Sequence, residues 1–137
     1  HSGEENSQPM DFLPFANRYP EVRIILAHLG SSWENERSQH VQAILASRHG
    51  NLFTDTSSAS SIMPGLIEWA VHEVGAEKIL FGTDTPIYHT AMQRARIDYA
   101  EITDRQKVLI LRENAVNLLG IAKNEASPQS AIEQATP

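Results

Sequence analysis

The sequence contains no cysteine, which excludes disulfides, thiolate metal sites and cysteine nucleophiles. Basic residues are few, because 11 Lys and Arg against 17 Asp and Glu give a net charge of −6. Phosphate binding needs a basic surface, so we expect no nucleic-acid partner. No apolar run approaches the roughly 18 residues of a membrane-spanning helix, so we expect no membrane partner. The lack of cysteine and of a signal-peptide pattern leads us to expect a cytoplasmic protein.

Two common cofactor motifs are also missing. The sequence has neither G-x-G-x-x-G nor G-x-x-x-x-G-K-[ST], so it gives no indication of dinucleotide or P-loop phosphate binding. What remains is an ordinary globular composition, with 137 residues of which 41% are hydrophobic and 20% charged. That length is typical of one domain of about 100–150 residues.

The distribution of apolar residues predicts an α/β fold. Short apolar segments rich in β-branched residues predict strands over 22–27, 51–55 and 78–81, the first of them buried on both faces. Apolar residues at helical spacing predict helices over 10–18, 33–49, 64–74, 90–100 and 103–119. Strands that alternate with helices indicate βα units and a parallel sheet. This pattern does not separate an open sheet from part of a barrel.

Signals at the ends of the chain complete this prediction. Thr103 and Gln106 have the spacing of a capping box at the start of the last helix, and Gly120 is placed to end it. Residues 123–137 are mostly small and polar, so we expect a disordered tail there.

A polar residue stands at the carboxyl end of each predicted strand. These residues are His28, Asp55 and Asp84. In parallel α/β folds the carboxyl ends of the strands form the edge where ligands and catalytic groups lie. An imidazole and a carboxylate suit a divalent zinc or manganese ion and can also transfer a proton.

Each of these residues also has a structural interpretation. His28 can be a buried histidine bonded to backbone, and Asp84 can shape the turn before Pro86. For Asp55 we favour a local cap of the loop that follows it. Gly82 favours function at the third strand, because glycine at a strand end often marks the close approach of another group.

Other histidines and one tryptophan are weaker candidates. His40, His49 and His72 lie in predicted helices among polar residues, so we expect them to be solvated. His89 follows the loop after the third strand and is a candidate for lining a pocket. We expect Trp33 to be a core residue rather than a ligand contact.

Four segments together resemble a known family. Residues 19–30, YPEVRIILAHLG, resemble the sixth-strand region of the amidohydrolase-related metal-dependent hydrolases, the amidohydrolase 2 group that includes aminocarboxymuconate-semialdehyde decarboxylase. Residues 51–57 and 78–86 resemble the seventh and eighth strands, and residues 113–121 resemble the closing helix. The four segments follow one another in the family's order and spacing.

The resemblance implies a partial (β/α)8 TIM barrel, with residues 1–122 as the C-terminal half of the domain and about strands six to eight present. It also implies a divalent metal, often zinc, at the C-terminal edge of the strands. Asp84 would be a metal ligand and proton acceptor, and His28 would bind the metal or polarise water or substrate. His1, in His1-Ser2-Gly3, resembles the fifth-strand metal ligand, although it can equally be a cloning remnant.

The sequence departs from the family in one respect. The family's strand-one H-x-H pair occurs nowhere in the chain, and strands one to four have no counterpart. A catalytic metal needs about three protein ligands, so we expect the isolated chain to be inactive.

Three hypotheses follow. The first is a fragment of a metal-dependent enzyme that hydrolyses or nonoxidatively decarboxylates a small organic acid through a metal-activated water. The second is a catalytically silent half-barrel that forms a homo-oligomer through its open strand edges. The third is an unrelated open α/β domain that binds a small molecule at the switch point of its sheet.

Overall fold

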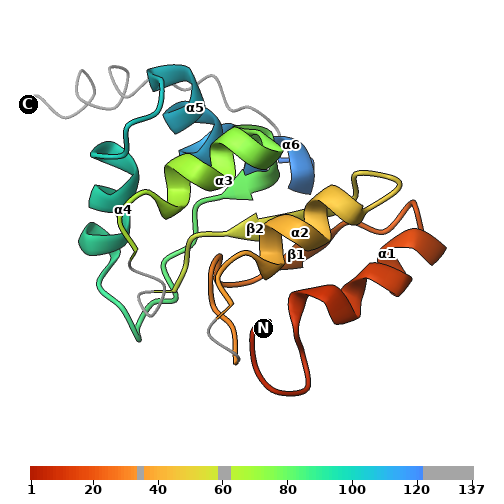
Figure 1. Cartoon of the computed structure of the whole chain (residues 1–137). Coiled ribbons are helices and arrows are strands. Elements are labelled where there is room, and N and C mark those ends of the chain that lie inside the picture. The colour runs from red at the N-terminus through yellow and green to blue at the C-terminus, as the bar shows by residue number, and fades with distance from the viewer. Residues whose placement is uncertain (34–35, 59–62, 122–137) are drawn as a thin grey trace, which may run out of the picture.

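The computed structural model describes residues 1–33, 36–58 and 63–121, and the predicted tail at 123–137 lies outside these residues. Three strands form one parallel sheet in the order β1 (Ile24–Leu26), β2 (Leu52–Asp55) and β3 (Ile79–Leu80), as Figure 1 shows. The predicted strands and their parallel pairing are therefore confirmed, in the predicted order. Each strand is shorter than its apolar segment in the sequence.

Helices connect and follow the strands. Helix α2 (Gln39–Ala46) joins β1 to β2, and α3 (Leu66–Val74) with the short helix η2 (Ala76–Lys78) joins β2 to β3. In Figure 1, α2 and α3 lie side by side over the strands. The other helices are η1 (Pro9–Phe12) and α1 (Leu13–Arg18) before β1, and α4 (Thr90–Asp98), α5 (Asp104–Val108), the π-helical segment η3 (Leu109–Glu113) and α6 (Asn114–Leu119) after β3.

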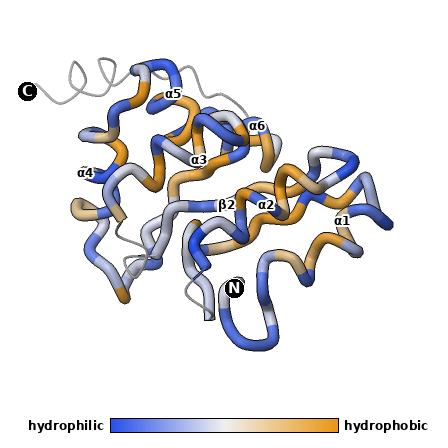
Figure 2. The backbone as a smooth tube through the Cα atoms, in the orientation of Figure 1, coloured by the Kyte–Doolittle hydropathy of each residue, from blue (hydrophilic) through white to orange (hydrophobic). Residues whose placement is uncertain are grey.

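The core lies between the sheet and these helices. One cluster contains Leu26 and Leu52 from the strands with Ala43 and Ile44 from α2. A larger cluster centres on α3 and β3 and includes Ile97 and Ile110 from the later helices. Figure 2 shows hydrophobic residues concentrated along α2 and α3. None of the helices in the described ranges is long and apolar enough to cross a bilayer.

The prediction that the first strand is buried on both faces is wrong. Leu26 is 1% exposed, whereas its neighbour Ile25 is 40% exposed. Successive residues of a strand point to opposite faces. Leu26 faces α2, and within the described residues the face that carries Ile25 is not covered to the same extent.

The predicted helix over 33–49 begins only at Gln39, and Trp33 is 62% exposed rather than in the core. The Glu36 carboxylate accepts hydrogen bonds from the Ser38 backbone N–H at 2.8 Å and from the Ser38 hydroxyl at 2.6 Å. Such local bonds compete with helix formation, which accounts for the later start.

His40 is also a correction. It is fully buried rather than solvated, and its Nε2 lies 2.9 Å from the Ala27 carbonyl oxygen and 3.0 Å from the Ser2 hydroxyl. Helical spacing alone did not show that the N-terminal segment covers this side of α2. His49 and His72 are exposed, as predicted.

The end of the fold follows the prediction with one interruption. Thr103 and Gln106 form the capping box, and Gly120 ends α6 in the left-handed conformation. Between them the helix widens into the π-helical segment, where the Ile110 carbonyl accepts a hydrogen bond from the Phe81 backbone N–H at 2.9 Å. A π-turn loosens the regular helical ladder, so this carbonyl can bond to the chain just after β3.

Candidate functional site

His28 and Asp84, in the segments that follow β1 and β3, share an uncommon backbone conformation. His28 has φ 71° and Asp84 has φ 53°, and within residues 1–33, 36–58 and 63–121 they are the only non-glycine residues with positive φ. This conformation costs about 1–3 kcal/mol and persists where surrounding contacts impose it, often at functional sites.

Contacts from the neighbouring strand hold His28 in place. Its backbone N–H donates to the Asp55 Oδ1 atom at 2.9 Å, and the next backbone N–H, that of Leu29, donates to the Asp55 carbonyl oxygen at 2.8 Å. His28 is 7% exposed as a residue, and the Nδ1 atom of its imidazole lies 2.7 Å from the Ser57 hydroxyl oxygen. His28 is therefore fixed at both its backbone and its ring.

Asp55 acts as the predicted local cap. Its Oδ1 accepts hydrogen bonds from the Ser57 backbone N–H at 3.0 Å and from the Ser57 hydroxyl. The same oxygen also accepts the backbone N–H of His28, which local sequence could not show. Asp55 thus joins the end of β2 to the end of β1.

The loop after β2 is held in place by α4. The Gln93 side-chain amide donates to the Ser57 carbonyl at 2.7 Å, and the Arg96 guanidinium donates to the carbonyls of Thr56 at 3.2 Å and Ser58 at 2.7 Å. Burial lowers the pKa of the Arg96 guanidinium. Three consecutive carbonyls of this loop are therefore bound by one helix.

Gly82, two residues after the end of β3, contacts the same loop. A Cβ atom at Gly82 would lie 2.9 Å from the Ser57 Cβ and 3.1 Å from the Asp55 Cγ. The close approach predicted for this glycine is confirmed, and the group that approaches is the loop carrying Ser57.

Sequence reasoning missed Ser57, Gln93 and Arg96. The available signals were a hydroxyl two residues after a strand-end aspartate, and two long polar side chains three residues apart on one helix face. Neither signal identifies the partner residue, because the contacts span 29 to 40 residues of sequence.

The N-terminal residues bring a second imidazole to His28. The rings of His1 and His28 are in edge-to-face contact, with centroids 4.5 Å apart and an interplanar angle of 63°. The buried Ser2 hydroxyl donates to the Ala27 carbonyl at 2.6 Å. Gly3 has φ 91° and approaches the Ser31 backbone so closely that a Cβ there would lie 2.6 Å from the Ser31 oxygen.

Asp84 lies four residues after the end of β3 at Leu80. Its carbonyl accepts the backbone N–H groups of Ile87 at 2.9 Å and Tyr88 at 3.3 Å. The loop that follows, residues 85–90, lines a cavity of about 420 Å³. His89, a weaker candidate from the sequence, lines this cavity, and its Nδ1 accepts the Ala91 N–H at 3.3 Å.

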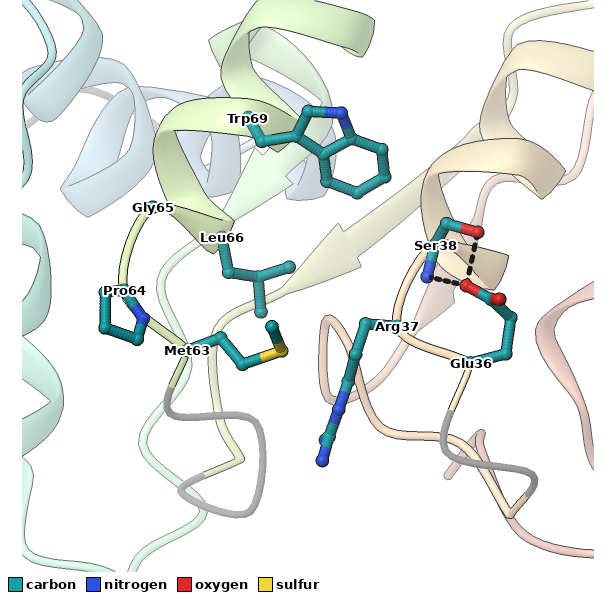
Figure 3. Close-up of a pocket in the computed structure, with 8 residues that line it drawn as sticks. All are labelled: Glu36, Arg37, Ser38, Met63, Pro64, Gly65, Leu66 and Trp69. Atoms are coloured by element: carbon teal, nitrogen blue, oxygen red, sulfur yellow. Dashed lines mark hydrogen bonds between the residues drawn. The ribbon is translucent and has the colours of Figure 1, made fainter.

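A separate cavity of about 280 Å³ lies between the segment before α2 and the start of α3, as Figure 3 shows. Met63, Leu66 and Trp69 line one side. Glu36 and Ser38 lie on the other, and their hydrogen bonds lower the pKa of Glu36. None of the predicted site residues lines this cavity.

Comparison with known proteins identifies the family. The sequence profile of the family described as amidohydrolase matches residues 1–121. The chain belongs to the amidohydrolase family. The profile match and the resemblance of the strand segments therefore agree.

Solved structures with the same fold can be compared with this amidohydrolase chain. It is similar to 2,6-dihydroxybenzoate decarboxylase from Rhizobium, with 22% identity and a TM-score of 0.61 over 81% of this chain and 38% of that chain. For dihydroxybenzoic acid decarboxylase from Polaromonas sp. JS666, solved with manganese and 2-nitroresorcinol, the identity is 23% and the TM-score is 0.59, over 80% of this chain and 38% of that chain. For amidohydrolase 2 from Bifidobacterium longum subsp. infantis, the identity is 20% and the TM-score is 0.64, over 89% of this chain and 48% of that chain.

These likenesses confirm the fold class, an α/β part of a TIM barrel. The amidohydrolase chain spans less than half the length of each of these three proteins.

The amidohydrolase chain has metal-binding donor types, although they do not assemble a complete site. Imidazole and carboxylate groups suit a divalent ion, and the His1 and His28 rings lie in contact. Within the described ranges, no three His, Cys, Asp or Glu side chains converge closely enough to hold a metal. The donor chemistry therefore fits a divalent metal. The assignment of His1, His28 and Asp84 as its ligands stays a prediction, and a complete metal site needs further ligands.

Proposed function

We propose that this chain is the C-terminal part of the catalytic barrel of a metal-dependent amidohydrolase. The enzyme hydrolyses or nonoxidatively decarboxylates a small organic acid. The observation that carries the proposal is the position of His28 just after β1. Its ring is bound by Ser57 and contacts a second imidazole, that of His1. Family membership and the decarboxylases among the similar structures support it.

The proposed cofactor is a divalent metal. Two similar decarboxylases were crystallised with manganese, which favours manganese over the zinc expected from the sequence. When bound, such an ion polarises substrate oxygens and lowers the pKa of a bound water to about 7. In our proposal His1, His28 and Asp84 supply ligands from this chain.

The residues of this chain have distinct roles in the proposal. Asp84, in the segment that follows β3, accepts and returns a proton. His28 presents one ring nitrogen to the substrate or its water, while Ser57 and Asp55 hold the ring in place. The loop over 85–90 follows Asp84 directly and lines a cavity, so it contributes to the choice of substrate.

Asp84→Asn in the full-length enzyme tests this proposal. The amide keeps the shape of the side chain but does not take up the proton, so we expect kcat/KM to fall by about 10²–10⁴-fold. Asp98→Asn is the control, because Asp98 is paired with Arg94 on the outer surface of α4. Undiminished activity of Asp84→Asn would exclude the assignment, and metal analysis of the purified enzyme distinguishes manganese from zinc.

One further observation supports the second hypothesis, in which the isolated chain is silent and self-associates. A cavity of about 400 Å³ beside β1 is lined entirely by apolar and aromatic residues, namely Phe12, Phe15, Tyr19, Val22 and Ile24. We call it the β1 groove. Within the described residues β1 pairs only with β2, so its other edge is open to a strand from a second copy.

A further inference from the structure

The Ser57 hydroxyl lies between two groups that compete for its single proton. Its oxygen is 2.7 Å from His28 Nδ1 and also makes a short hydrogen bond to Asp55 Oδ1. A hydroxyl donates one hydrogen bond and accepts others through its lone pairs. Which neighbour receives the proton determines which nitrogen of the His28 ring carries hydrogen.

Asp55 settles this competition. An ionised carboxylate only accepts hydrogen bonds, and the Oδ1 atom already accepts the backbone N–H groups of His28 at 2.9 Å and Ser57 at 3.0 Å. The contact between Ser57 and Asp55 therefore requires Ser57 to be the donor. Since its only proton is then used, the Ser57 oxygen must accept from His28, and the His28 Nδ1 must carry hydrogen.

We propose that Ser57 and Asp55 are positioning residues that fix neutral His28 in its Nδ1–H tautomer. Its Nε2 then carries the lone pair at the C-terminal edge of the sheet. This inference deepens the proposed function, and only its consequence for metal or substrate binding rests on that proposal. A lone pair at Nε2 binds a divalent cation or accepts a hydrogen bond from a hydroxyl or water, and does not donate to an anionic oxygen.

The surroundings keep this arrangement rigid. Ser57 is 5% exposed and His28 is 7% exposed, so bulk water competes little for their hydrogen bonds. Gln93 binds the Ser57 carbonyl, and Gly82 leaves room for the Ser57 Cβ that a larger residue would displace. The backbone of Ser57 therefore cannot move away without losing the Gln93 bond, and its Cβ packs closely against Gly82.

Nitrogen NMR of the metal-free, full-length protein labelled in its histidine rings tests the tautomer directly. At a pH of about 8, where ordinary histidine is neutral, the two tautomers give different nitrogen shifts. His28→Gln identifies the signal. We expect His28 to show a protonated Nδ1 in the wild type and to move to a predominantly protonated Nε2 in Ser57→Ala.

Two more variants sharpen this test. Asp55→Asn keeps an accepting oxygen at the Oδ1 position, because the backbone N–H groups of His28 and Ser57 donate there, so Ser57 still donates to it and we expect His28 to keep a protonated Nδ1. Ser32→Ala is the matched control, because the Ser32 hydroxyl has no hydrogen-bond partner among the described residues, and we expect no change there. Protonated Nε2 in the wild type, or an unchanged His28 signal in Ser57→Ala, overturns the inference.

Manganese binding to the same variants separates this inference from the proposed function. If His28 is a metal ligand, loss of its supporting hydrogen bond weakens manganese binding by about 10–100-fold in Ser57→Ala. A changed tautomer with unchanged manganese affinity supports the inference and removes His28 from the proposed ligand set. The tautomer measurement needs neither metal nor substrate, so it stands even if the proposed reaction is wrong.

Discussion

His40 shows at the residue scale how a buried titratable group organises this edge of the protein. Its Nε2 lies within hydrogen-bond distance of both the Ala27 carbonyl and the Ser2 hydroxyl. Burial lowers the pKa of His40 to about 4, and His28 adds a smaller lowering effect. The hydrogen bond to the Ala27 carbonyl and the charge of Asp55 raise this pKa by less. The neutral ring therefore holds Ser2, and with it the neighbouring His1, against β1.

This depressed pKa predicts acid sensitivity. Above pH 6.5 His40 is neutral in both the folded and the unfolded chain, so its contribution to stability is complete. Between about pH 6.5 and 4 only the unfolded chain takes up the proton. The free energy of unfolding should fall by up to about 3 kcal/mol across this range, at about 1.4 kcal/mol per pKa unit.

Urea denaturation at several pH values measures this effect. We expect His40→Gln to lose the part of the decline that His40 causes, whereas His72→Gln, at an exposed position on α3, should keep it. The same decline in His40→Gln as in the wild type would assign the acid sensitivity to other groups.

At the scale of elements, two contacts attach the closing helices to β3. The Asn114 side-chain amide, at the start of α6, donates to the carbonyls of Ala76 and Ile79, both at 2.7 Å. The Ile110 carbonyl accepts the Phe81 N–H. These bonds satisfy buried backbone groups around a strand of only two residues, and β3 in turn places Gly82 and Asp84. The helices thus help to position the site without contributing to it directly.

Asn114→Ala tests this attachment. It leaves two carbonyls without their side-chain donor in a buried place, so we expect the free energy of unfolding to fall by about 1–3 kcal/mol. Asn117→Ala, an exposed change on the same helix, should alter it by less than about 0.5 kcal/mol. Equal effects of the two substitutions in urea denaturation would contradict the role of Asn114.

At the scale of the whole molecule, the sheet is incomplete as a barrel. Helices α2 and α3 cover one face, Ile25 on the other face is 40% exposed, and the β1 groove lies beside the open edge of β1. The chain spans 38% to 48% of the three compared proteins. In a full barrel further strands would cover such surfaces, because closing the sheet removes its edges.

The β1 groove predicts concentration-dependent self-association of the isolated chain. Phe15 is 61% exposed in this groove, so Phe15→Glu should lower the average mass measured by light scattering. Trp33→Glu is a matched control, because Trp33 is 62% exposed and lies outside the groove. A wild-type chain that stays monomeric at all concentrations would exclude this surface as a self-association site.

How much could be predicted depended on whether the determining contacts are local. Thr103, Gln106 and Gly120 act within a few residues, and the structure has them as the sequence predicts. His40 and Trp33 were mispredicted, because the N-terminal segment and the Glu36 side chain alter their surroundings. Helical spacing does not contain that information.

The sequence by itself determined the order of strands and helices, the parallel sheet, and the placement of Asp55 at the end of β2 with His28 and Asp84 in the segments that follow β1 and β3. These features could be predicted because apolar periodicity is set by residues that are close in sequence, and parallel strand direction follows from general rules for connecting strands through helices. Only the tertiary structure decided that Ser57 lies between His28 and Asp55, and that Gln93 and Gly82 keep it there. Hydrogen-bond direction depends on distances between atoms from different elements, and these distances exist only once the elements have packed together.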